Sequence, residues 1–135
     1  MKRIIPPALV VLAAAVTAGG KDPKPNEVSA FMRQKLTSAS EVLEGLAIED
    51  YEKIGVHAQK LALISLDSTW QVLQTDEYSQ QSNEFRRAAM AMAKAADEKN
   101  LDAVALAYVE MTMKCVQCHK YVRNQPSPPD AKKAK

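Results

Sequence analysis

The middle of this 135-residue chain has almost no proline or glycine. No proline occurs between Pro25 and Pro126, and only two glycines, Gly45 and Gly55, fall in that stretch. Strand-like alternation of apolar and polar residues is also missing, so a β-sheet protein is not expected. The stretch is rich in Ala, Leu, Glu, Lys, Gln and Met, which all favour helix. The length suggests one domain, and the composition predicts an all-α fold.

The chain begins as exported proteins do. Lys2 and Arg3 precede an apolar run over residues 4–16, and small residues follow that run. This layout is typical of a secretory signal peptide, so we predict cleavage after Ala18 and a periplasmic location. The apolar run is shorter than the ~20 residues that a membrane-spanning helix needs. We therefore expect residues 1–18 to be removed and the protein to have no stable membrane insertion.

The exported part of the chain has no excess of charge. Without Lys2 and Arg3 the 18 basic residues fall to 16, which equals the 16 acidic residues. Proteins that bind nucleic acid present strongly basic surfaces, so nucleic acid is not an expected partner. Residues 19–25 are rich in Gly, Pro and Lys and predict a linker, and residues 125–135 predict a disordered tail.

Four helical segments are predicted between residues 26 and 124. Asn26 is a candidate cap for the first helix and Gly45 for its end, and Trp70 and Leu73 are assigned to the second helix. The third carries many alanines, and the fourth begins after Asn100. Short links favour an up-down-up-down four-helix bundle. The residues predicted to face inward from the first helix are Val28, Met32, Leu36, Ala39, Leu43 and Leu46.

The most informative segment is the Cys-Val-Gln-Cys-His run at residues 115–119. The C-x-x-C-H pattern is typical of covalent haem attachment. Residues three apart on a helix point the same way, so both thiols can reach the two vinyl groups of one porphyrin. The motif predicts one haem c, held by Cys115 and Cys118, with His119 as an axial iron ligand near the C-terminus of the fourth helix.

Three alternatives exist for this cysteine pair. A thioredoxin-type dithiol would follow a strand, and none is expected here. A zinc site needs four ligands, and His57 is the only other histidine. A plain disulfide is the third alternative.

Beyond the motif, the chain resembles the class II cytochromes c, the cytochrome c′ group. Residues 95–102 resemble that family's link between its last two helices. Arg123, four residues after His119, matches a frequent family arginine, which makes it a candidate haem contact. The family also has an arginine in helix one, and Arg33 is not a clean counterpart of it. Further family-like positions are Ala107, Tyr108, Trp70 and the turn at residues 45–54. The resemblance implies a four-helix bundle with haem near its C-terminus.

The resemblance also implies that the distal residue comes from the first helix. Met32 is the only methionine there, and a thioether is a soft ligand that suits haem iron. We expect Met32 as second axial ligand and electron transfer with redox partner proteins as the function. The alternative is a five-coordinate iron that binds nitric oxide or carbon monoxide, with Met32 as core packing. Lys35 is expected to be solvated, and His57 is a weaker candidate ligand.

No constellation of residues suggests an enzyme. The sequence has no Ser/His/Asp set and no Gly-rich phosphate loop, so the protein is expected to be an electron carrier. Members of the resembled family often dimerise through their first two helices. Leu63 or Ile64 would serve a homodimer here, if they are exposed.

Overall fold

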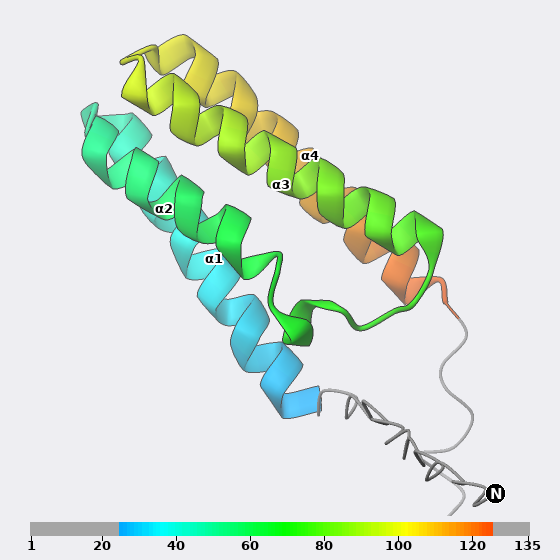
Figure 1. Ribbon diagram of the computed structural model, residues 1–135. Coiled ribbons are helices and arrows are strands. Elements are labelled where there is room, and N and C mark those ends of the chain that lie inside the picture. Colours follow the sequence, from blue (N-terminus) through cyan, green and yellow to red (C-terminus); the bar gives the residue numbers. More distant parts are fainter. Residues whose placement is uncertain (1–24, 126–135) are drawn as a thin grey trace, which may run out of the picture.

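The computed structural model describes residues 25–125 (Figure 1). Consecutive helices pack against one another, and α1 also contacts α4, which closes a four-helix bundle. The prediction of an all-α, up-down-up-down bundle is confirmed. The predicted signal peptide, most of the linker and nearly all of the tail lie outside the described residues. The elements are α1 (Pro25–Ile48), α2 (Tyr51–Ile64), the 3-10 helix η1 (Ser68–Trp70), α3 (Asp76–Asp97) and α4 (Leu101–Arg123).

Side-chain caps begin three of the helices. Asp50 accepts a hydrogen bond from the backbone N–H of Lys53, and Asn100 accepts one from that of Ala103. The hydroxyl of Thr75 does the same at the start of α3. Each contact satisfies a backbone donor that a helix start leaves without a partner. The caps therefore set where α2, α3 and α4 begin.

Gly45 does not end the first helix, contrary to the prediction. The helix continues to Ile48, and Glu49 takes the left-handed conformation that ends it, with φ of 59°. Gly45 lies instead where α1 and α2 approach most closely. A Cβ atom there would meet Ile54 Cγ1 at 2.8 Å and the carbonyl of Asp50 at 3.2 Å. The residue is glycine because the two helices leave no room for a side chain.

The inward face of α1 is rotated by about one residue from the predicted one. Leu36 is 67% exposed and Leu43 is 53% exposed, although both were expected in the core. The buried positions are Lys35, Ser38 and Val42, which follow the spacing of three and four residues that one helix face requires. The prediction followed the leucines, whereas the helix buries the stripe next to them.

The segment between α2 and α3 is longer than predicted. Trp70 and Leu73 do not belong to the second helix, because α2 ends at Ile64 and residues 65–75 form a connector that contains η1. Trp70 is only 2% exposed. Its Nε1 donates to Ser82 Oγ at 2.7 Å, and the Tyr78 hydroxyl donates to its carbonyl. These bonds fasten the connector to α3.

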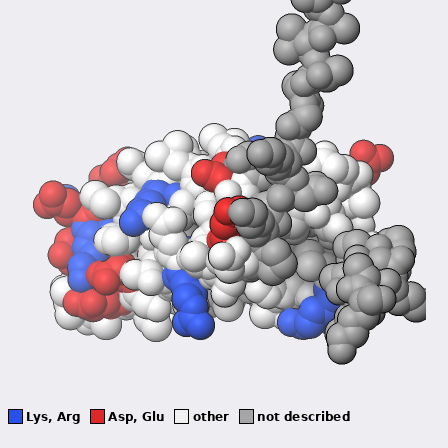
Figure 2. Space-filling model, turned by 90° about the horizontal axis from the view of Figure 1, so that it is seen from below, with Lys and Arg blue, Asp and Glu red and all other residues white. Residues whose placement is uncertain are grey.

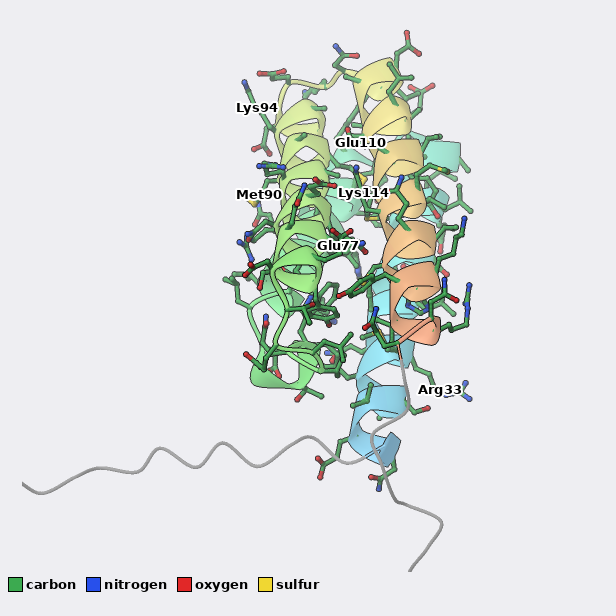
Figure 3. The ribbon with its side chains drawn as sticks, turned by 90° about the vertical axis from the view of Figure 1, so that its right-hand side faces the viewer. Arg33, Glu77, Met90, Lys94, Glu110 and Lys114 are labelled. Atoms are coloured by element: carbon green, nitrogen blue, oxygen red, sulfur yellow. The ribbon has the colours of Figure 1, made fainter. Side chains whose placement is uncertain are left out.

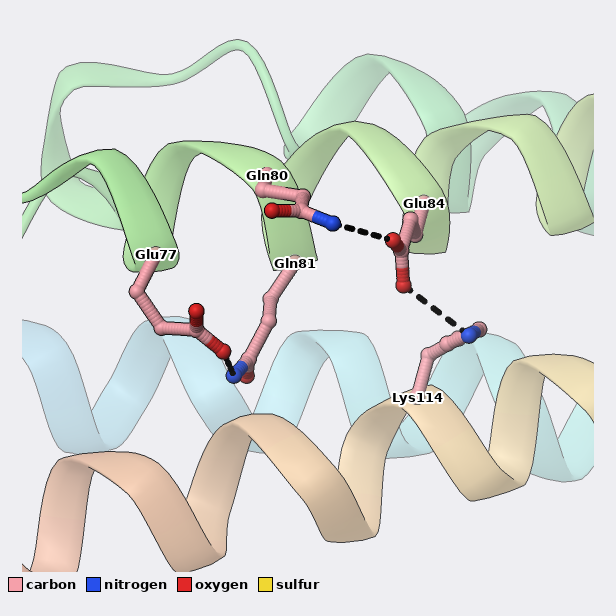
Figure 4. A network of polar contacts seen from close by, with 5 residues as sticks. All are labelled: Glu77, Gln80, Gln81, Glu84 and Lys114. Atoms are coloured by element: carbon pink, nitrogen blue, oxygen red, sulfur yellow. Dashed lines mark hydrogen bonds and ion pairs between the residues drawn. The ribbon is translucent and has the colours of Figure 1, made fainter.

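The predicted seams of α3 and α4 are confirmed. Phe85 and Met92 of α3 are buried, as are Val104 and Met111 of α4. The alanines of α3 are mostly buried and allow α3 and α4 to pack closely. Lys114 of α4 also pairs with Glu84 of α3 at 2.9 Å, at the edge of this interface (Figure 4).

The surface carries charges of both signs. In Figure 2 basic and acidic groups alternate at one end of the viewed face, and uncharged areas lie between the others. Within residues 25–125 no helix is long and apolar enough to cross a membrane. Of the two residues considered for a homodimer, Leu63 is exposed and Ile64 is buried.

Candidate functional site

Cys115, Cys118 and His119 lie in the second half of α4. Both cysteines are half-buried, both are free thiols, and both pack against the core. Their spacing of three places them on the same side of the helix. The two thiols do not form a disulfide in the structure. Within residues 25–125, no cluster of three or more metal-ligating side chains offers the zinc site considered above.

Two cavities open beside this part of α4, and residues of α1 and α4 line both. The larger measures about 420 Å³ and has Cys115 in its wall, and the smaller measures about 150 Å³ and has Cys118. Met32, Lys35 and His119 line both cavities. Of the neighbouring helix pairs, α1 and α4 pack least closely, which leaves this space between them.

The walls fit a flat apolar cofactor that is attached at one edge. Apart from the shared residues, the larger cavity is lined by groups such as Leu61, Phe85 and Met111. The smaller cavity has Trp70 and Val72 in its wall. One thiol borders each cavity, and the imidazole of His119 borders both. A haem joined to the two thiols would bury its apolar surface in these cavities, with the imidazole beside it.

The surroundings of His119 favour its neutral form. Partial burial lowers the pKa of the imidazole below its usual range, and the positive charges of Lys35 and Arg123 lower that pKa further. A neutral imidazole has the free lone pair that a metal ligand requires. Burial raises the pKa of the Cys118 thiol, so this group is protonated at neutral pH. The site therefore presents a neutral nitrogen ligand and two thiols.

The other predicted site residues lie in different places. Met32 of α1 is half-buried and borders both cavities, whereas Arg123 is exposed at the smaller one. Arg33 is exposed at the larger cavity and extends outward from α1 (Figure 3). His57 is not near either cavity; it borders a separate cavity with Asp50 and Lys53.

The expectation that Lys35 is solvated is wrong. Its side chain is 7% exposed, and its Nζ lies 4.2 Å from the ring centroids of both Trp70 and Phe85. Burial lowers the pKa of this lysine, while the neighbouring cysteines oppose that effect. Sequence reasoning missed Lys35 because a lysine is usually exposed. The sequence did carry a signal for its burial, because Lys35 lies three residues before Ser38 and seven before Val42 and so shares their face of α1.

No family model and no curated protein sequence matches the chain. Among solved structures, it is similar to cytochrome c prime from Alcaligenes xylosoxidans. A ferrous arginine-to-lysine variant with bound nitric oxide matches with a TM-score of 0.54 and 18% identity, over 73% of this chain and 94% of that one. The nitric oxide complex of a leucine-to-alanine mutant matches with a TM-score of 0.53 and 18% identity, over 72% and 93%.

This is the class II cytochrome c fold. The match spans nearly the whole of each cytochrome c prime chain, so it includes all four helices rather than one hairpin. At this identity the likeness concerns the arrangement of the helices. The assignment of Cys115, Cys118 and His119 still rests on their own spacing and on the cavities beside them.

Proposed function

We propose that this protein is a c-type cytochrome that holds one haem c and binds a small gas, nitric oxide or carbon monoxide, at the iron. The observation that carries the proposal is the C-x-x-C-H motif beside two largely apolar cavities that share His119. Two similar cytochrome c prime structures hold nitric oxide, which supports gas binding over electron transfer alone.

In this proposal each protein group has one task. The thiols of Cys115 and Cys118 would hold the haem to α4 through thioether bonds, and the imidazole of His119 would ligate the iron. When bound, the haem supplies an iron that changes oxidation state and takes small ligands. Trp70, held by Ser82 and Tyr78, closes one wall against water. Arg123, exposed at the smaller cavity, would contact the haem edge.

A second candidate function is electron transfer to redox partner proteins, with Met32 as the sixth ligand. The observation that favours it is the position of Met32, which borders both cavities together with His119. A methionine ligand would raise the reduction potential and close the iron to gases. The two functions therefore differ in whether the second axial position is open.

The test is expression of the chain with a cytochrome c maturation system, followed by denaturing electrophoresis and a haem stain. The wild type should stain, the double variant Cys115→Ser, Cys118→Ser should not, and His119→Ala should still stain because its thioether bonds remain. Carbon monoxide should then shift the spectrum of the reduced protein. A wild type that never stains contradicts the haem assignment, and a stained protein that ignores carbon monoxide favours electron transfer.

We also propose a periplasmic location and a homodimer that uses the exposed apolar side of α1 and α2. Leu63 and Leu43 supply exposed apolar surface on these helices. Cell fractionation tests the location. Light scattering of the haem protein at high concentration tests the dimer, and a strict monomer would contradict it.

A further inference from the structure

Lys35 is a buried cation that has no anion beside it. Lys53 pairs with Glu41 and Glu44, and Lys114 pairs with Glu84, each at 2.9 Å. Within residues 25–125, no carboxylate or other hydrogen-bond acceptor pairs with the ammonium of Lys35. Burial lowers the pKa of Lys35 and the two neighbouring cysteines raise it again, and the faces of two aromatic rings hold the charged form without neutralising it.

In the described part of the chain, residues 25–125, no acidic side chain lines the cavities that Lys35 borders. Their charged residues are Lys35, the exposed Arg33 at the larger cavity and the exposed Arg123 at the smaller one. The nearby lining is mostly apolar or aromatic. A charge in such surroundings is screened little by water, so its field acts strongly inside the cavity. The site therefore favours a negatively charged occupant.

We infer that the ferric haem protein binds small inorganic anions at its iron, and that Lys35 is the residue that selects them. The inference rests on the proposed haem attachment and adds a ligand class to it. Lys35 of α1 and His119 of α4 line the same two cavities, so an iron held by His119 would have the lysine in its pocket wall. On the open iron of the proposed function, the anion would add to the vacant coordination position, so no bond is broken and no redox change is required.

The ligand class follows from size and charge. The anion would have to fit beside the haem in the space that remains, so it has no more than three atoms, such as azide, nitrite or fluoride. Arg33 and Arg123 are exposed, so they would suit the haem propionates, which stay near water when haem is bound. Lys35 is buried, so it is the cation that remains for a ligand on the iron.

Azide is the test ligand, and neutral imidazole is its comparison. Both are titrated against the ferric haem protein and followed by the shift of the haem absorption. Lys35→Leu should weaken azide binding by about tenfold or more, and leave imidazole binding within about twofold. Lys35→Arg should retain the azide affinity. Lys120→Met removes an exposed charge one residue from His119 and should change neither affinity.

Two further measurements keep the inference open to refutation. The titrations are repeated in Met32→Ala, so that a methionine–iron bond cannot mask a difference, and with Lys35→Gln in case the leucine variant misfolds. The reduction potential should fall in Lys35→Leu, because a nearby cation favours the ferrous state.

If the azide affinity is equal with and without the lysine, the inference is overturned. This holds even if the reduction potential falls, because a fall alone would mean that Lys35 acts on the haem propionates. An equal loss of azide and imidazole also overturns it, because that loss reports a damaged pocket. Absence of haem from the wild type is a different failure, which refutes the proposed function itself.

Discussion

The ammonium of Lys114 lies 2.9 Å from the carboxylate of Glu84. Lys114 directly precedes Cys115, the first cysteine of the C-x-x-C-H motif. Glu84 also accepts a hydrogen bond from Gln80, which lies on the same helix (Figure 4). The pair joins α3 to the segment of α4 that holds Cys115. It therefore fixes the helix on which the proposed haem ligand is carried.

Glu84→Gln should remove a pH-dependent part of the stability. The hydrogen bond from Lys114 lowers the pKa of Glu84 below its ordinary value of 4.5, and Gln80 adds to this. A carboxyl whose pKa is lower in the folded state stabilises the fold above its unfolded pKa, and this contribution disappears as the pH falls through the folded pKa. Urea unfolding at pH 7 and pH 3 should show a larger difference between wild type and variant at pH 7. An equal difference at both pH values would contradict the prediction.

Gly45→Ala and Gly55→Ala should have opposite effects. A methyl group at Gly45 would lie 2.8 Å from Ile54 Cγ1 and force α1 and α2 apart, which should cost about 1–3 kcal/mol. At Gly55 the nearest atom is Asp97 Oδ1 at 3.9 Å, so alanine fits and should stabilise the helix by about 0.5–1 kcal/mol. Thermal unfolding of the two variants provides a matched comparison, and a stabilised Gly45→Ala would refute the close approach.

Ser82→Ala should loosen the connector that carries Trp70. The serine hydroxyl accepts the indole N–H at 2.7 Å, and both side chains are buried. Without the hydroxyl the indole donor has no partner, which should cost about 1–3 kcal/mol. Ser79→Ala, at an exposed position on the same helix, should change stability little. The check is urea unfolding followed by Trp70 fluorescence, since Trp70 is the only tryptophan.

The sequence predicts the bundle well because α3 and α4 each carry one clear apolar stripe. Haem attachment at Cys115, Cys118 and His119 stays a prediction, which rests on their spacing along one helix. The prediction fails on α1, where two adjacent stripes compete. Leu36 and Leu43 suggest one face, and the structure buries Lys35, Ser38 and Val42 instead.

That choice could not be made from periodicity alone, because it depends on tertiary contacts. Gly45 must face Ile54 for the helices to approach, and this sets the rotation of α1. The ammonium of Lys35 then lies over the aromatic rings of Trp70 and Phe85, which are far away in sequence. The connector shows the same limit, since Trp70 fits the helical period of α2 and yet lies in η1, where it donates a hydrogen bond to Ser82 of α3.

Met32→Ala decides between the two candidate functions. Met32 borders both cavities with His119, so its sulfur is available either to the iron or to core packing. Because we propose an open iron, we expect the wild-type ferrous protein to be high-spin and to bind carbon monoxide readily. Met32→Ala should then leave its spin state unchanged and alter carbon monoxide affinity only by about threefold or less.

A methionine ligand would give a different set of results. The wild-type ferric protein would show the weak near-infrared charge-transfer band of sulfur-ligated haem, and the ferrous form would be low-spin and closed to carbon monoxide. Met32→Ala would remove that band, lower the potential and open the iron. Lys35→Leu serves as the matched control, because it removes the neighbouring wall residue, adds no sulfur and leaves the Met32 thioether in place. Loss of the band in Met32→Ala but not in Lys35→Leu would assign the Met32 sulfur to the iron and make electron transfer the function.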